Sequence, residues 1–182
     1  AGPDRKHQPV SAHFLRAWIT YQDDPDFRRL AWATMLFTTS MMLFPHYQAL
    51  GREQLGSTQG DLLSWLIAQN AGMGFFSLFS GVIADRYGTR LSLRCCMFLA
   101  GTAPLVALAM AHGIIPDGRH GYWLTFLMLG LTPLTIRCLM NYALELVDES
   151  SHARYVSTLT LTMAIPFLLS PLVGALIDWW GF

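Results

Sequence analysis

Charge is what this sequence has least of. Only 13% of its 182 residues are Asp, Glu, Lys or Arg, whereas soluble domains carry roughly 25%. A soluble domain with so few charges would have too little polar surface to cover its core. The formal net charge is zero, which excludes nucleic-acid binding driven by bulk electrostatics. The composition therefore points away from a soluble or nucleic-acid-binding protein.

Cysteine is also scarce, and catalytic patterns are absent. The three cysteines, Cys95, Cys96 and Cys138, lie inside apolar runs without the spacing of a metal site, so we interpret them as small packing residues. The sequence contains no nucleophile–base pair, paired-carboxylate site or phosphate-binding loop. We therefore expect no enzyme activity, no metal and no cofactor. The first 28 residues contain no signal-peptide core either.

Long apolar runs are what the sequence has in abundance. Because about 17 to 25 largely uncharged residues can cross a bilayer as a helix, five stretches qualify, and barrel-type alternation is missing from them. They cover residues 30–50, 62–84, 95–111, 122–146 and 156–177. We predict an all-α, polytopic transmembrane bundle of about five helices in residues 29–182, preceded by a polar cytoplasmic loop or linker in residues 1–28.

The distribution of cations predicts the orientation of these spans. Cytoplasmic loops of membrane proteins are enriched in Lys and Arg. If the N-terminal segment is cytoplasmic, nine cations lie inside, two lie outside, and Arg137 lies within a span. The inside group is Arg5, Lys6, Arg16, Arg28, Arg29, Arg86, Arg90, Arg94 and Arg154, and the outside pair is Arg52 and Arg119. We therefore expect a multi-pass protein of the cell (plasma or inner) membrane with a cytoplasmic N-terminal segment.

One short pattern occurs twice, each time at the end of an apolar run. "GVIADRYGTR" (residues 81–90) and "GALIDWWGF" (residues 174–182) share Gly-x-x-x-Asp-x-x-Gly. With the predicted orientation, the two copies lie on opposite faces of the membrane. A three-span unit repeated upside down produces this arrangement, and inverted repeats are common in secondary transporters.

The first copy resembles a motif of the major facilitator superfamily, Gly-x-x-x-Asp-Arg-x-Gly followed by two basic residues. Thr89 stands where the first of these basic residues is usual. The segments "DDPDFRRLAW", "NYALELVDESSHARY" and "SPLVGALIDWWGF" also resemble parts of that family, so the resemblance covers about residues 26–182. The residues that match the motif are Gly81, Asp85, Arg86, Gly88 and Arg90.

This resemblance implies helices seven to eleven of twelve, with the last helix missing from a six-helix half. The first half is an alternative placement, because the halves of the family repeat each other. The resemblance implies a secondary active transporter that moves a small solute by alternating access. Its partners would be the lipid bilayer, the solute, a coupling proton or ion, and the missing half of the transporter.

The resemblance also implies a cytoplasmic gating motif. In the family, this loop and its charged neighbours hold the cytoplasmic helix ends together in one conformation. Here the motif would include Glu145 and Arg154 beside the matched residues. From physical chemistry alone, Gly81 would permit close helix approach, Gly88 would close a tight turn with positive φ, and Asp85 would accept hydrogen bonds from a helix N-terminus. A solvated basic loop is the alternative interpretation.

Polar side chains within the spans are the candidates for a solute cavity. Pro133, Arg137, Asn141 and Glu145 recur every four residues and so share one helical face. An arginine near mid-span is costly unless it faces a cavity or the bundle interior. It would attract an anionic group of the solute or pair with an acid in the missing half; alternatively, it would be a fixed ion pair that locks two helices. The cavity candidates are Arg137, Asn141, Gln69 and Asn70.

Two other functions remain open at this point. A non-transporting sensor or scaffold with the same fold would bind a solute without moving it. A membrane enzyme acting on lipids would need a catalytic carboxylate, histidine or metal cluster at the interface, and the sequence shows none.

Overall fold

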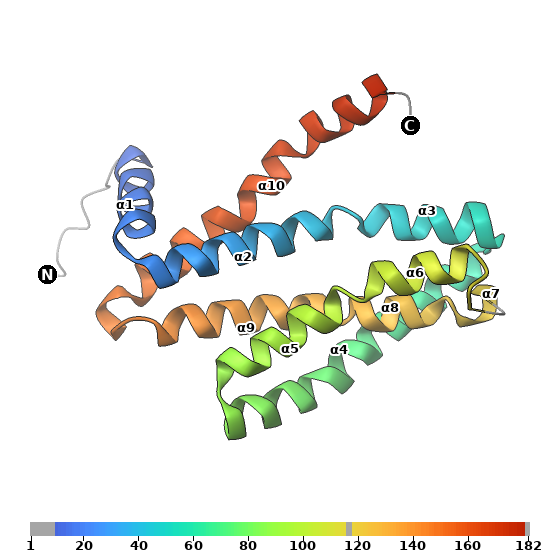
Figure 1. Cartoon of the computed structure of the whole chain (residues 1–182), viewed down its shortest axis with the longest axis horizontal. Helices are drawn as coiled ribbons and strands as arrows, with labels where there is room; N and C mark the ends of the chain where they lie inside the picture. Colours follow the sequence, from blue (N-terminus) through green and yellow to red (C-terminus); the bar gives the residue numbers. More distant parts are fainter. Residues whose placement is uncertain (1–9, 116–117, 181–182) are drawn as a thin grey trace, which may run out of the picture. The chain divides into compact units, whose positions relative to one another are not determined.

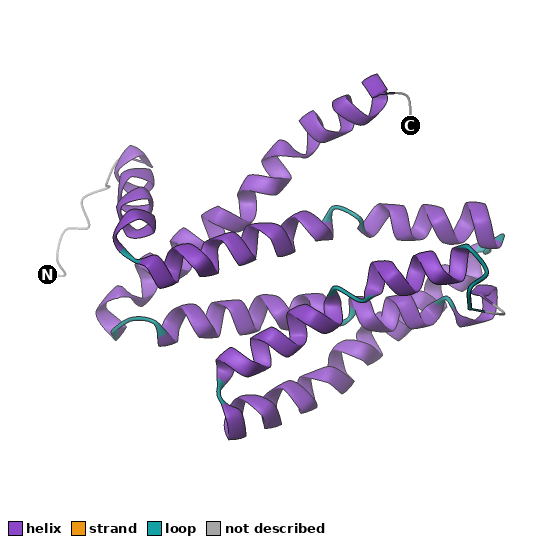
Figure 2. Ribbon diagram, viewed as in Figure 1, coloured by secondary structure: helices purple, strands orange, loops and turns teal. Residues whose placement is uncertain are grey.

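The computed structural model describes residues 10–115 and 118–180, and every regular element in that part of the chain is a helix (Figures 1 and 2). The predicted all-α fold class is therefore confirmed. Of the cations used to predict orientation, Arg5 and Lys6 lie outside the described residues. The side chains of Arg16, Arg119 and Asp178 are likewise not described.

Four segments of the described chain are long and apolar enough to cross a bilayer. These are Gly60–Tyr87, Thr89–Ala111, Trp123–Glu145 and Glu149–Leu172. They coincide with four of the five predicted spans. The chain is therefore a multi-pass helical membrane protein.

The remaining predicted span, residues 30–50, is not one helix. It is divided between α2 (Pro25–Met41) and α3 (Phe44–Leu55). Pro45 has no backbone N–H to donate to the Met41 carbonyl, and its ring would clash with that carbonyl in a continuous helix. The helix therefore ends at Met41, and Pro45 is instead accommodated in the first turn of α3.

The same proline rule interrupts the span that contains α5 (Thr89–Ala100) and α6 (Ala103–Ala111). Pro104 lies in the first turn of α6, and the carbonyl four residues before it belongs to Ala100, the last residue of α5. The break lies inside a membrane-spanning segment. The backbone groups that it frees must find partners within the protein, since lipid offers none.

Pro133 interrupts the next span in the same way. α8 (Trp123–Leu129) ends four residues before Pro133, and α9 (Leu131–Glu145) follows after Gly130. The Gly130 N–H is not lost, because it donates to the carbonyls of Phe126 and Leu127 at 3.1 Å each. A proline at this position removes one backbone hydrogen bond from a continuous helix, and the structure has an interruption there.

The chain divides into two compact units. Residues 39–142 form one, which we term the central unit; residues 1–38 and 143–182 form the other, which we term the terminal unit. The central unit contains α3, α4 (Gln59–Tyr87), α5, α6, α7 (Gly118–Gly121), α8 and most of α9.

The core of the central unit is aromatic and lies where α3, α4, α6 and α8 meet. Trp65 of α4 stacks on Phe126 of α8 with ring centroids 4.8 Å apart and meets Tyr122 edge-on at 5.1 Å. The Tyr122 hydroxyl donates to the Tyr47 carbonyl of α3 at 2.8 Å. Gly51 packs against the rings of Trp65 and Tyr122, where a side chain would not fit.

Two glycines bring α4 and α8 into backbone contact. A Cβ on Gly72 of α4 would overlap the carbonyl oxygen of Leu127. A Cβ on Gly130 would overlap the Gln69 carbonyl and lie 2.6 Å from the Met73 nitrogen. Close approach through glycine is a typical device of helix packing in membranes. α4 and α8 are also adjacent in Figure 1.

The terminal unit contains α1 (Val10–Asp23), α2 up to residue 38, η1 (Glu149–Ser151) and α10 (His152–Trp180). Part of the predicted loop or linker is therefore helical. The physical reason is the apolar recurrence at positions 10, 14, 17, 18 and 21, which matches one helical face. α1 packs against α10, and α10 continues without interruption through Pro166 and Pro171.

A single carboxylate holds the N-terminus of α2 and the start of α10 together. The Asp24 carboxylate accepts hydrogen bonds from the backbone N–H groups of Asp26 at 2.9 Å and Phe27 at 3.1 Å, which caps α2. It also accepts the Tyr155 hydroxyl of α10 at 2.8 Å. The Tyr155 ring packs edge-on against Phe27, with centroids 4.8 Å apart.

These contacts lower the pKa of the Asp24 carboxyl. Burial by itself raises this pKa, but the hydrogen bonds from Phe27, Tyr155 and Asp26 stabilise the ionised form and together outweigh burial. Because the pKa is lower in the folded state, Asp24 contributes stability above its unfolded pKa of about 3.9. That contribution is lost as the pH falls through the lower folded-state pKa.

We expect Asp24→Ala to lower the free energy of unfolding of the terminal unit by about 1 to 2 kcal/mol at neutral pH, since it removes a helix cap and a part-buried hydrogen bond. Asp24→Asn is the matched control, because it keeps the shape and a capping oxygen but cannot ionise. Thermal unfolding in detergent micelles from pH 7 to pH 3 measures both. The advantage of the wild type over Asp24→Asn should shrink below about pH 4; a constant difference would contradict the assignment.

Candidate functional site

The predicted polar face of α9 is uncovered in the described chain. Arg137, Asn141 and Glu145 are all exposed, while Cys138 and Leu139 beside them are buried. Within the central unit, α9 therefore buries Cys138 and Leu139 and leaves Arg137 and Asn141 exposed. Arg137 forms no hydrogen bond or ion pair with another described residue. Its guanidinium lies within the span Trp123–Glu145, where lipid would be a costly neighbour.

The two amides of α4 have different surroundings. The Gln69 side chain is partly buried where α4 crosses α8. The backbone carbonyl of Gln69 faces Gly130 there. Asn70 is exposed, and its amide nitrogen donates to the Leu66 carbonyl of the same helix at 2.8 Å. Asn70 therefore does not need a partner outside α4 to satisfy that donor in an apolar environment.

The four cavity candidates do not form one cluster in the described chain. α4 and the α8–α9 segment run in the same direction, since Gln69 contacts Gly130 while Ser80 contacts Cys138 further along. Arg137 is seven residues beyond Gly130, which corresponds to about 10 Å along a helix. The structure thus places Gln69 and Asn70 at one level of the span, and Arg137 and Asn141 at another.

The residues of the predicted gating motif that match the family pattern lie at the connection between α4 and α5. α4 ends at Tyr87 and α5 begins at Thr89, so Gly88 alone joins them. Gly88 has φ 89°, and its N–H donates to the Ala84 carbonyl at 2.9 Å. The positive φ predicted for Gly88 is confirmed, and a residue with a Cβ would be strained there.

The charged residues of this connection are exposed. Asp85 and Arg86 lie in the last turn of α4, and Arg90 lies in the first turn of α5. None of these three side chains forms an ion pair or hydrogen bond with another described residue. The close helix approach expected at Gly81 is not made within the described chain either, because no atom of another helix comes within 4 Å of the position of its Cβ.

The two other residues of the predicted gating motif, Glu145 and Arg154, belong to the terminal unit. Arg154 is exposed in the first turn of α10, and its guanidinium lies 5.5 Å from the centroid of the Tyr155 ring. Its backbone carbonyl accepts the hydroxyls of Ser157 and Thr158. The N-terminal turn of α10 therefore carries a cation next to the Asp24–Tyr155 contact.

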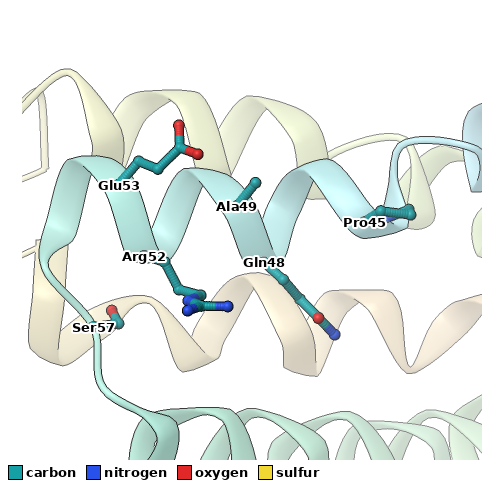
Figure 3. A pocket seen from close by; sticks show the side chains of 6 residues that line it. All are labelled: Pro45, Gln48, Ala49, Arg52, Glu53 and Ser57. Carbon is teal, nitrogen blue, oxygen red and sulfur yellow. The ribbon is translucent and has the colours of Figure 1, made fainter. Parts of the chain in front are cut away.

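A hollow of about 620 Å³ lies on α3, away from the predicted cavity residues. Figure 3 shows that Gln48 and Arg52 project to one side of α3, whereas Glu53 projects to the other. The hollow is therefore lined by one cationic and one anionic side chain, Arg52 and Glu53. It lies outside the four membrane-spanning segments. Its lining residues are Pro45, Gln48, Ala49, Arg52, Glu53 and Ser57.

Sequence reasoning did not identify a buried polar cluster in the central unit. It consists of Ser80, Ser92, Cys96 and Cys138, from three different helices. The three cysteines had been interpreted as packing residues; Cys96 and Cys138 are buried, whereas Cys95 is only partly buried. The four-residue spacing of Ser92 and Cys96 could have predicted that both lie on one face of α5. No pattern in the sequence predicts that this face contacts α4 and α9.

Comparison of the chain with family models, with curated proteins and with solved structures finds no match.

Proposed function

We propose that this chain is part of a secondary active transporter that moves a small solute across the membrane by alternating access. The observation that carries the proposal is the uncovered polar face of α9. An arginine and an asparagine lie within a membrane-spanning segment and are exposed in the described chain. Since lipid is a costly neighbour for both, a water-filled cavity or a further part of the protein would cover them.

The helix interruptions support a moving rather than a rigid bundle. The breaks at Pro104 and Pro133 lie inside membrane-spanning segments, and interrupted helices provide the hinges and solute-facing backbone groups of many transporters. The single-residue connection at Gly88, with its exposed charges, would act as the gating motif on the cytoplasmic side. A cytoplasmic N-terminal segment is part of the proposal.

Arg137 favours a solute with an anionic group, because a guanidinium offers several donors to a carboxylate or a phosphate. Asn141, one helical turn away, would contribute an amide to the same face. Gln69 and Asn70 would line the cavity at the level of Gly130. Coupling to a proton or another ion belongs to the same mechanism and would use acids outside the described residues.

Solute flux into liposomes tests the proposal directly. The polypeptide encoded by the complete reading frame is reconstituted and offered radiolabelled carboxylates, phosphate esters, sugars and amines, with and without a proton gradient. We expect saturable uptake, with preference for an anionic solute, and none in protein-free liposomes. Binding without flux would favour a sensor or scaffold with the same fold, and the absence of both would contradict the proposal.

A further inference from the structure

Four buried side chains from three helices meet in the central unit, apart from the proposed solute cavity. Ser80 lies on α4, Ser92 and Cys96 lie on α5, and Cys138 lies on α9. Their exposed fractions are 6%, 0%, 4% and 7%, respectively. All four lie within membrane-spanning segments, so their polar hydrogens must be satisfied by the protein itself.

The hydrogen bonds can be assigned by counting protons. Ser92 Oγ donates its only proton to the Ser80 carbonyl at 3.0 Å. The Oγ–Oγ contact of 2.8 Å must therefore have Ser80 as the donor. With its proton used, Ser80 Oγ acts only as an acceptor toward Cys138 at 3.4 Å and Cys96 at 3.8 Å.

Both thiols therefore point at the same oxygen. The two sulfurs therefore lie on either side of one hydroxyl oxygen or beside each other around it, 3.4 Å and 3.8 Å from it. Neither thiol has a role in the proposed transport mechanism, and neither is in a disulfide. Two thiols that share one small acceptor, in a buried site, are a ligand pair for a metal ion that accepts two sulfurs.

We propose that Cys96 and Cys138 form a two-thiol site for a soft metal ion of low coordination number, and that Hg²⁺ is the ion that fits it. In dilute chloride the ion is present as uncharged HgCl₂, which can enter an apolar region. The two Hg–Cl bonds break and two Hg–S bonds form. The two thiol protons and two chloride ions are released to water, and no electron is transferred.

The net charge of the metal–dithiolate unit favours Hg²⁺ over other soft metal ions. Two thiolates and Hg²⁺ form a neutral unit, whereas two thiolates and Cu⁺ leave one negative charge. An unpaired charge in this buried site would be costly, and no cationic side chain contacts the cluster in the described chain. Zn²⁺ prefers four protein ligands in a closed site, and only two sulfurs are present here.

Occupation of the site would join α5 to α9 through two strong bonds. The Ser80 hydroxyl would remain as a neighbour able to turn its proton from Ser92 toward a bound thiolate. The metal would thus stabilise the packing of the central unit. This consequence does not depend on transport, so its test is independent of the proposed function.

The test compares two variants that each retain two cysteines. Cys95→Ala keeps Cys96 and Cys138, whereas Cys96→Ala keeps Cys95 and Cys138, and Cys95 is outside the cluster. The purified chain in detergent micelles is titrated with HgCl₂ under reducing-agent-free conditions. Bound mercury per chain is measured by elemental mass spectrometry and free thiols by a chromogenic disulfide reagent. Unfolding is followed by circular dichroism.

For Cys95→Ala we expect one ion per chain, loss of both free thiols per ion, and a rise of about 5 °C or more in the unfolding midpoint. For Cys96→Ala we expect no such rise. A dithiol chelator should reverse the effect in the wild type, which serves as the check if a variant folds poorly. Equal responses of the two variants, binding of one ion to each thiol, or a comparable stabilisation by Zn²⁺ would overturn the proposal.

Discussion

Replacing Gly72 by alanine is expected to lower the free energy of unfolding of the central unit by about 3 kcal/mol or more. The added methyl group would overlap the Leu127 carbonyl oxygen, which is a backbone atom and cannot rotate away as a side chain can. α4 would have to move away from α8, and this would also loosen the reciprocal contact at Gly130. Lost packing cannot be offset by the better helix propensity of alanine, which is worth about 1 kcal/mol.

Gly74→Ala is the matched control, because Gly74 lies two residues away on the same helix with no atom within 4 Å of the position of its Cβ. The same chemical change there should leave stability unchanged or raise it slightly. Thermal unfolding of both variants in detergent micelles, followed by circular dichroism and by size-exclusion chromatography, measures the difference. If the two variants unfold at the same temperature, α4 and α8 do not approach each other at Gly72.

The contrast between glycines shows what a sequence pattern can and cannot predict. Gly88 was recognised because a turn between two helices demands a positive φ, and that is a property of the local backbone. Gly81 and Gly72 are both small residues on α4, but only Gly72 meets another helix. Which face of a membrane helix meets its neighbour depends on packing, and hydropathy along one helix contains little information about it.

The helix breaks near prolines could have been predicted more fully from the sequence. The predicted spans were drawn from apolar runs and did not take the positions of the prolines into account. Pro45 and Pro133 each lie four residues beyond a helix end, as the loss of one backbone donor requires. Pro166 and Pro171 lie within α10, so the rule is not sufficient by itself. A span prediction based on hydropathy alone joined α2 and α3 because apolar residues continue across the break.

Contacts between residues far apart in the chain were beyond sequence reasoning. Asp24 and Tyr155 are separated by 131 positions, and the two segments that contain them gave no sign that these residues meet. Ser80 and Cys138 are separated by 58 positions. The Ser80–Cys138 contact is buried and the Asp24–Tyr155 contact is part-buried, and each provides a partner for polar groups that are shielded from water. The polar face of α9, in contrast, follows from spacing alone.

Replacing Arg137 by alanine in the complete protein is expected to slow uptake of an anionic solute by about tenfold to a hundredfold, because a charge-assisted hydrogen bond is worth about 1.5 to 3 kcal/mol. Arg137→Lys keeps the charge but loses the fork of donors, so it should retain an intermediate rate. Initial uptake rates into liposomes, measured over a range of solute concentrations, separate an effect on affinity from one on turnover. Uncharged solutes, if transported, should be affected less.

Arg28→Ala provides the control for surface charge, because Arg28 is exposed on α2 and outside the four membrane-spanning segments. Unfolding of the Arg137 variants in detergent then distinguishes the two roles left open for this residue. A guanidinium that binds solute can be removed with little loss of stability, whereas removal of one partner of a buried ion pair typically costs about 3 to 5 kcal/mol. Reduced uptake with unchanged unfolding would assign Arg137 to the cavity; reduced stability would make it a structural lock, and unchanged affinity and turnover would remove it from the site.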